Sequence, residues 1–378
     1  MSSSSANSSM SKGRYSRLVQ YGTDGNGYVT FAPDDTGQIN SELFDTNYAT
    51  SRIRPWDERR RQAFAVSQGY RRIFERTGDT AIERIAQACT ACGSDLRFQE
   101  LVCEAVNATK LRLKGANFCR ARLCPLCNWR RSLKLRYQLG RVLNVVFSQD
   151  DSLRMLLLIL TEPNSSWNDF GSAVGRLLSA IAKLMRYKRV KAAVKHSFRA
   201  LEVTCPRPEE FHPHFHVLLV VPGAYLEPRS ALYITQGEWA AMWRKALGAD
   251  GKRIIDIRVT ENHGEVAKYV TKPGGYLELT GEQWRCDDQV LDTLHYGFAS
   301  RRMITWSRSL SPIRRALGFL DTDDQSEDLV DVGNDDDGVE WKVVKILTYR
   351  WSRNKEGRWA YRLRYICLPD ELEGGDDG

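Results

Sequence analysis

The sequence predicts a mixed fold, α+β or α/β, with at least one antiparallel pair of strands. Short apolar runs alternate with amphipathic segments between residues 154 and 273, as expected for strands interleaved with helices. Two β-rich runs, 341–351 and 359–368, flank the polar turn SRNKEGR and predict a C-terminal hairpin. A group of cysteines between residues 89 and 127 predicts a small zinc-binding segment.

Local periodicity predicts the individual elements in order. Apolar side chains near helical spacing predict a helix over 128–147, and Asn262 and Pro273 suit the start and stop of a short helix. The apolar face of 128–147 is predicted to contain Leu133, Tyr137, Val142 and Val145. The other predicted helices are 54–78, 171–190, 235–247 and 262–273, and the predicted strands are 154–161, 197–205, 214–221 and 253–260.

Composition divides the chain into five predicted segments. Residues 1–50 lack a sustained apolar period and are expected to be loose, and residues 321–338 hold nine Asp/Glu and no Lys/Arg, as in a linker. The predicted segments are a loose N-terminus (1–50), a basic helical and Cys-rich zinc-binding region (51–150), a catalytic domain (151–320), an acidic linker (321–340) and a C-terminal hairpin (341–378).

The 378-residue chain has a net charge of +8, and the acidic run conceals an even more basic remainder. Such a charge distribution favours a polyanionic partner, and nucleic acid fits best. The longest apolar runs, 155–160 and 217–221, are much shorter than the ~20 residues that span a bilayer. The Ser-rich start shows no signal-peptide pattern, so we expect a cytoplasmic protein without a membrane partner.

The segment HPHFHVLLVV, residues 212–221, places histidines at alternate positions of a predicted strand. Side chains alternate faces along a strand, so His214 and His216 share one face, which we expect to point away from the core. Two imidazoles in this arrangement suit one shared cation. His212 has the same parity, but the adjacent Pro213 assigns it to the preceding loop rather than to the ligand set. The alternative is that these histidines are ordinary hydrogen-bonded strand residues.

A third ligand follows from strand pairing. If the strands 197–205 and 214–221 form a hairpin, Glu202 lies opposite His214, with the two Cβ atoms about 5 Å apart. In the same register Ala200 lies opposite the second histidine. The hairpin therefore predicts a metal site of two histidines and one carboxylate.

The segment EVAKYVTKP, residues 265–273, is the second unusual stretch. On a helix Glu265 and Tyr269 share a face, and Lys268 and Lys272 adjoin it. A phenolate could attack phosphorus, the ammonium groups would neutralise phosphate charge, and the carboxylate could activate water. The alternative is a capped helix with a packed aromatic ring and solvated lysines.

Together these stretches resemble the HUH endonucleases, and most closely the replication initiator proteins of small rolling-circle plasmids. The resemblance spans roughly residues 85–280 and rests on four segments in matching order. They are ANFCRARLCPLCNWRRSLKL (116–135), LLLILTEPN (156–164), HPHFHVLLVV (212–221) and EVAKYVTKP (265–273). The tyrosine follows the histidines, which favours initiators over relaxases, and a transposase of related chemistry stays open.

The resemblance implies an α+β fold in which a central antiparallel sheet has helices packed on one face. It implies that His214, His216 and Glu202 hold Mg²⁺ or Mn²⁺, which polarises the scissile phosphate. Tyr269 would attack that phosphate, leaving a 5′-phosphotyrosine and a 3′-OH that primes synthesis, and Glu265 would activate water to end the cycle. The expected partners are plasmid origin DNA, single-stranded or in a hairpin, and the host replication helicase and polymerase.

The cysteine spacing Cys119-x4-Cys124-x2-Cys127 supplies three thiolates for a closed tetrahedral zinc site. Cys89 and Cys92 are both candidates for the fourth ligand, and the family resemblance favours Cys92. The alternative is a set of buried or free thiols.

The residues after the last of these cysteines combine a ring with guanidinium groups. Trp129, Arg130 and Arg131 suit stacking and phosphate contacts with DNA. The alternative is a helix start with a buried tryptophan. The segment EPN (162–164) predicts no chemistry beyond a structural turn.

Two other functions fit part of the sequence. HPHFHVLL also satisfies the pattern of the histidine-triad nucleotide hydrolases, in which a histidine is the nucleophile and no metal is needed. Pro213 disfavours that reading, because the strand position should donate to the ladder. A non-enzymatic, zinc-containing DNA-binding regulator accounts for the charge and the cysteines but leaves the histidine strand without a role.

Overall fold

The computed structural model divides the chain into two compact units. Unit 1 contains residues 1–57, 93–117 and 335–378, and unit 2 contains residues 58–92 and 118–334. The described residues are 21–23, 29–31, 42–47, 51–105, 107–207, 209–248, 255–262, 264, 275–319, 328–333, 340–354 and 356–368. In this part of the chain, none of the helices combines the length and hydropathy needed to cross a bilayer.

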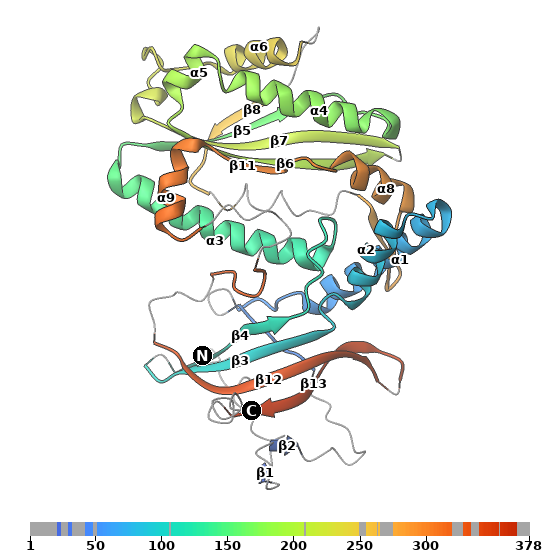
Figure 1. Ribbon diagram of the computed structural model, residues 1–378. Coiled ribbons are helices and arrows are strands. Elements are labelled where there is room, and N and C mark those ends of the chain that lie inside the picture. The colour runs from blue at the N-terminus through green and yellow to red at the C-terminus, as the bar shows by residue number, and fades with distance from the viewer. Residues whose placement is uncertain are drawn as a thin grey trace, which may run out of the picture. The chain divides into compact units, whose positions relative to one another are not determined.

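Unit 2 is built around a five-stranded antiparallel sheet (Figure 1). The strands lie in the order β11 (Ile304–Trp306), β6 (His196–Arg207), β7 (Glu210–Val221), β5 (Arg154–Thr161) and β8 (Ile255–Val259). Every neighbouring pair is antiparallel. β6 and β7 follow one another through a tight turn in which Glu209 has a φ of 68°. The α+β class with antiparallel pairing is therefore confirmed.

Helices cover both faces of this sheet, so the expectation of helices on one face only is wrong. α4 (Trp167–Leu184) and α6 (Gln236–Leu247) lie on one side and α3 (Pro125–Gln149) on the other (Figure 1). The reason lies in β7, where Phe215 is buried in the cluster that includes α4 and Leu218 in the cluster that includes α3. A strand that is apolar on both faces has to be covered on both.

Helix α3 begins at Pro125 because Cys124 has the extended backbone of an N-cap and proline fits the first helical turn. Its buried face differs from the predicted one. The side chains packed on the sheet are Leu135, Leu139, Val142, Leu143 and Val146. Tyr137 instead packs elsewhere in unit 2, with its ring 6.2 Å from the Phe319 ring and directly against the backbone of Gly333. The apolar residues of α3 therefore make two separate contacts, one with the sheet and one with Phe319 and Gly333. Helical spacing alone does not distinguish them.

Two helices from the first part of the chain complete unit 2. They are α1 (Trp56–Thr77), most of which belongs to this unit, and α2 (Thr80–Ala91), which the sequence did not predict. Arg72 on α1 forms an ion pair of 2.6 Å with Asp288 on α8 (Asp288–Gly297). The remaining elements are α5 (Lys188–Ala193), η1 (Gly223–Leu226), β9 (Leu277–Thr280), β10 (Gln283–Cys286), η2 (Arg308–Leu310) and α9 (Ser311–Ala316).

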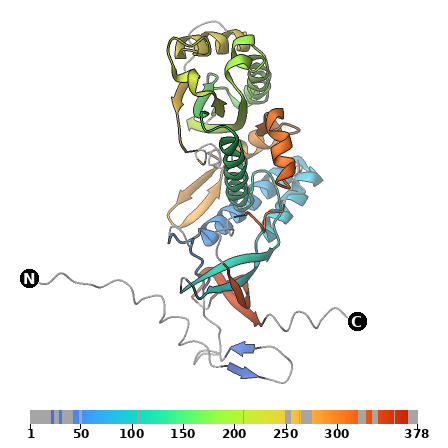
Figure 2. The same cartoon turned by 90° about the vertical axis from the view of Figure 1, so that its left-hand side faces the viewer.

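Unit 1 contains a six-stranded antiparallel sheet, whose β3, β4, β12 and β13 are the cyan and red arrows of Figure 2. The strands lie in the order β1 (Tyr21–Thr23), β2 (Val29–Phe31), β13 (Trp359–Cys367), β12 (Lys342–Arg353), β3 (Asp95–Cys103) and β4 (Ala108–Ala116). β12 pairs with β13 on one side and with β3 on the other. The C-terminal strands are thus part of a larger sheet.

The core of unit 1 forms on one face of this sheet. The Phe98 ring lies edge-on to the rings of Trp56 and Tyr349, with centroid distances of 5.7 and 6.0 Å. All three side chains are at most 2% exposed. Strands β3 and β4 were not predicted, because basic residues interrupt their apolar alternation and a register shift lies between Arg97 and Phe98.

Candidate metal sites

The three predicted ligands of the first site meet on β6 and β7. The register pairs Glu202 with His214 and Ala200 with His216, so the predicted strand pairing is confirmed. Oε2 of Glu202 lies 3.1 Å from Nε2 of His214 and 2.8 Å from Nε2 of His216. The side chains are buried, and one ligand atom from each lies within 4.8 Å of the others. This spacing allows a single cation to contact all three.

Hydrogen bonding directs a lone pair of His214 toward the carboxylate. Its Nδ1 lies 3.0 Å from the backbone carbonyl of His212, which can only accept, so Nδ1 carries the proton. Nε2 then faces Oε2 of Glu202 and donates to it when protonated; without that proton both atoms are acceptors. Two acceptors at this distance need a cation or a proton between them. The donor set of two nitrogens and one oxygen therefore fits a divalent metal ion.

The electrostatics of the site favour an ionised carboxylate. Burial by itself raises the pKa of Glu202, but the hydrogen bonds and charges of His214 and His216 outweigh burial and lower the pKa to about 2. Glu202 is therefore negative throughout the neutral range. A metal ligand has to be deprotonated to bind, so this side chain is prepared for a cation.

His212 lies beside the site but outside the group of three. Its ring centroid is 5.3 Å from that of His214, and its Nδ1 lies 2.8 Å from Oδ1 of Asn164. Nδ2 of Asn164 donates to Glu210 over 2.8 Å. Asn164 thus joins the loop after β5 to the start of β7. The sequence had suggested only a turn for this asparagine, although its position in EPN, next to a strand end, was a usable signal.

The four residues of the predicted tyrosine helix, Glu265, Lys268, Tyr269 and Lys272, lie outside the described residues. Just before them Gly264 is described and buried. A Cβ at Gly264 would come within 2.8 Å of Nε of Arg136, which lies on α3. The chain therefore reaches α3 immediately before this segment, and α3 covers the sheet face that carries the two histidines.

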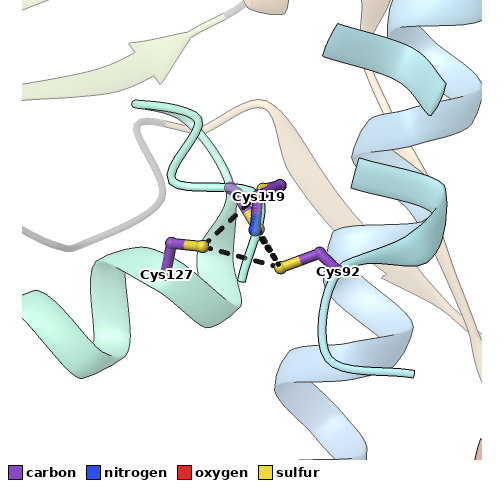
Figure 3. Close-up of side chains that lie close together, drawn as sticks. Cys92, Cys119 and Cys127 are labelled. Carbon is purple, nitrogen blue, oxygen red and sulfur yellow. Dashed lines mark hydrogen bonds between the residues drawn. The ribbon is translucent and has the colours of Figure 1, made fainter. Parts of the chain in front are cut away.

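A second group consists of Cys92, Cys119, Cys124 and Cys127, whose sulfur atoms lie within 4.8 Å of one another. Three of the four side chains point toward one another in Figure 3. The Sγ–Sγ distances are 3.5 Å for Cys92–Cys127, 3.6 Å for Cys119–Cys127 and 3.6 Å for Cys92–Cys124. Four thiolates about 2.3 Å from a central zinc ion would lie about 3.8 Å apart. The group therefore fits a tetrahedral zinc ion.

The backbone around this group is arranged for negative sulfur atoms. The amide of Cys119 donates to Sγ of Cys92 over 3.3 Å, and the amide of Arg120 donates to Sγ of Cys127 over 3.2 Å. The hydrogen bond with Cys124 raises the pKa of Cys119, but those with Cys127, Cys89 and Cys92 lower it to about 5. Sγ of Cys89 lies 3.7 Å from Sγ of Cys119. Cys89 is not among the four cysteines whose sulfur atoms all lie within 4.8 Å of one another.

The predicted DNA contacts after Cys127 have different environments. Arg130 and Arg131 are 2% and 7% exposed. Arg130 donates to the carbonyls of Leu329 and Val330 at 2.9 and 2.7 Å, and Arg131 donates to the carbonyl of Ala121 at 3.2 Å. These guanidinium groups are engaged within unit 2, which argues against the expected phosphate contacts.

Trp129 is partly exposed, and its ring lies 5.6 Å from the guanidinium of Arg130. A DNA contact by Trp129 stays a prediction. The residues that hold Arg130 belong to the acidic segment, of which 328–333 is described. Leu329 is 1% exposed there, so this piece of the expected linker is packed on α3.

An antiparallel sheet with a buried His–His–Glu group and a four-cysteine group defines an α+β protein with two candidate metal sites. The chain belongs to a family of replication proteins, because the family model described as "Replication protein" matches residues 110–360. This membership confirms the predicted resemblance to plasmid replication initiators.

Individual relatives agree with the family. "Protein rep" of Lentilactobacillus hilgardii is 32% identical over 320 residues, which cover 82% of this chain and 95% of that protein. "Protein rep" of Lactiplantibacillus plantarum is 30% identical over 336 residues, which cover 85% and 100%. "Protein rep" of Streptococcus pneumoniae is 32% identical over 295 residues, which cover 75% and 86%. No solved structure is significantly similar to the chain.

Proposed function

We propose that this replication protein starts rolling-circle replication of a plasmid by nicking one strand of the origin and later rejoining it. The observation that carries the proposal is the meeting of Glu202, His214 and His216 on one face of the sheet. Nicking and joining of a phosphodiester needs a charge-stabilising site of this kind. Family membership supports the replication role.

In the proposed reaction the phenolate oxygen of Tyr269 attacks the scissile phosphorus. The bond from phosphorus to the 3′ oxygen breaks, the 3′ oxygen takes up a proton, and the 5′ phosphate stays esterified to the tyrosine. The free 3′-OH primes synthesis. Lys268 and Lys272 balance the phosphate charge, and Glu265 deprotonates the water that releases the final product.

Glu202, His214 and His216 would hold the divalent cation, Mg²⁺ or Mn²⁺. Bound there, the cation draws negative charge from the scissile phosphate. The sheet fixes all three side chains by strand pairing, and the His212 carbonyl fixes the tautomer of His214. The position of Gly264 against α3 supports an approach of the tyrosine segment from that side.

The cysteine group would hold a structural zinc ion. Cys92 follows α2, Cys119 lies in the loop before α3, and Cys127 lies in the first turn of α3 (Figure 3). Cys124 is the N-cap of α3. Zinc would therefore tie α2 to the helix that covers the histidine face. This role is structural, since four cysteines leave no open position for substrate.

The test is a covalent adduct between the purified chain and DNA. The full-length protein is incubated with Mg²⁺ or Mn²⁺ and a labelled single-stranded library that contains the plasmid origin, and adducts are separated under denaturing conditions and sequenced. Wild type and Tyr296→Phe, a matched change of a half-exposed tyrosine on α8, should form the adduct. Tyr269→Phe should form none.

An adduct from Tyr269→Phe at the wild-type level would exclude Tyr269 as the nucleophile, and the absence of any adduct from wild type would exclude the nicking reaction. Chelation separates the other enzyme class, since cleavage that survives EDTA fits a histidine-triad hydrolase. A covalent adduct at all excludes a purely DNA-binding regulator.

A further inference from the structure

The sheet of unit 1 is strongly basic. Strands β3, β4, β12 and β13 together contain ten Lys/Arg and two Asp/Glu. Three of the basic side chains form ion pairs within unit 1: Arg350 with Asp95, Lys345 with Glu100 and Arg362 with Glu42. A surface with this excess of positive charge attracts a polyanion.

Strand pairing places one of these basic residues, Arg97, in a row with Thr348 and Tyr365 across the sheet. Thr348 on β12 pairs with Arg97 on β3 and with Tyr365 on β13. Arg97 pairs in turn with Gly115 on β4. Directly paired residues share a face, so this row presents a guanidinium, a hydroxyl and a phenol side by side. Arg350, two residues after Thr348, extends the same face.

The side chains of the row are exposed to solvent, and the residue that pairs with Arg97 on β4 is a glycine. The Tyr365 side chain is 58% exposed and that of Arg350 is 56% exposed, and Arg97 is also exposed. Side-chain atoms of Arg97 lie 3.6–3.8 Å from the Cβ position of Gly115, an ordinary van der Waals distance, so Arg97 extends over β4 at this glycine. The aromatic core that includes Phe98 lies on the opposite face.

We propose that the face formed by Arg97, Thr348, Arg350 and Tyr365 binds single-stranded DNA, with the guanidinium of Arg97 on a phosphate and the Tyr365 ring stacked on a base. The sheet spacing supports this geometry: Arg97 and Tyr365 are two strands apart, about 10 Å, so one short stretch of single strand can contact both. An exposed ring beside arginines is the combination that unpaired bases require. The inference rests on the proposed function only for the choice of DNA as the polyanion.

The experiment measures equilibrium binding of the full-length protein to a fluorescent oligothymidylate and to a duplex of equal length, without added divalent cation. Tyr365→Ala should weaken binding to the single strand roughly tenfold and to the duplex much less, since only unpaired bases stack. Tyr365→Phe keeps the ring and should bind like wild type. Because no cation is added, the result does not depend on nicking.

Arg97→Ala tests the phosphate contact through salt dependence. The slope of log K against log salt for the single strand should fall by about 0.7. The matched control is Arg71→Ala, an exposed arginine on α1 in unit 2, which should leave the slope unchanged. Thermal unfolding checks that the variants are folded.

Three results would overturn the proposal: wild-type single-strand affinity in Tyr365→Ala, an equal loss on duplex and single strand, or an effect of Arg71→Ala as large as that of Arg97→Ala. If binding changes as expected while no covalent adduct forms in the separate nicking assay, the DNA face stands and the nicking reaction fails. If binding does not change as expected while the covalent adduct forms, the DNA-binding face is rejected and the nicking reaction is supported.

Discussion

Oε2 of Glu202 lies 2.8 Å from Nε2 of His216, although the two residues belong to different strands and both are 3% exposed. A contact this deeply buried is held by strand pairing and not by flexible loops. The site is therefore expected to keep its geometry in the absence of DNA, and it can be tested one side chain at a time.

Removal of one imidazole should abolish specific cation binding. His216→Ala leaves two of three ligands, and we expect affinity for Mn²⁺ to fall more than about 100-fold, beyond the loss typical of supporting residues. Isothermal titration calorimetry measures the change. His196→Ala is the matched control, because His196 lies on β6 away from the site and contacts Ser309. Unchanged affinity in His216→Ala contradicts the site.

The metal-free protein should lose stability in acid through Glu202. Its pKa of about 2 in the folded state lies below the ordinary carboxyl value of about 4.3. A lowered folded pKa stabilises the fold above about pH 4.3, and this contribution disappears as the pH falls toward 2. The difference in unfolding free energy between wild type and Glu202→Gln should therefore shrink between these pH values. Urea unfolding at several pH values measures it, and a constant difference argues against an ionised Glu202.

Zinc content should distinguish the two candidate fourth ligands. Cys92→Ser removes one of the four sulfurs that come together, so we expect loss of bound zinc and a lower melting temperature. Cys89→Ser should retain one zinc ion per chain. Atomic emission spectrometry of the purified variants gives the content. Zinc loss in Cys89→Ser with retention in Cys92→Ser would reverse the assignment.

Arg130 should contribute to stability and not to DNA binding. Arg130→Ala leaves the carbonyls of Leu329 and Val330 without their donors, and we expect a loss of about 1–3 kcal/mol in unfolding free energy. The salt dependence of DNA binding should not change. A fall in the salt slope by about 0.7–0.9 would instead restore Arg130 as a phosphate contact.

Glu265 should act after the first nick. Glu265→Ala is expected to form the covalent adduct at the wild-type rate and to release it by water slowly, because the proposed base is missing. Single-turnover measurement of adduct formation and decay separates the two steps. Decay at the wild-type rate rejects the proposed role.

The sequence predicted the ligand-bearing hairpin in detail because strand alternation and pairing are local rules. The register that pairs Glu202 with His214 also pairs Ala200 with His216. The expectation that the histidine face points away from the core is wrong, because Leu218 and Val220 lie on the same face and are buried against α3. An apolar run in the sequence does not determine which helix packs on it.

The burial of Arg130 was also beyond local rules. A basic run after a cysteine looks the same whether its partner is a phosphate or a distant carbonyl, and here the partners lie about 200 residues away. Strand β3 was missed for a similar reason, because β12, one of its two partners, comes near the end of the chain. Long-range pairing of this kind leaves little trace in a short window of sequence.

The position of β12 between β3 and β13 has a consequence for synthesis on the ribosome. Roughly 240 residues separate the end of β3 from the start of β12; at about 5–20 residues per second, the edge of β3 waits some tens of seconds for its neighbour. A chain that stops early would keep that edge exposed and tend to aggregate. Completion of the C-terminal strands would thus act as a check that only finished protein molecules persist in the cell.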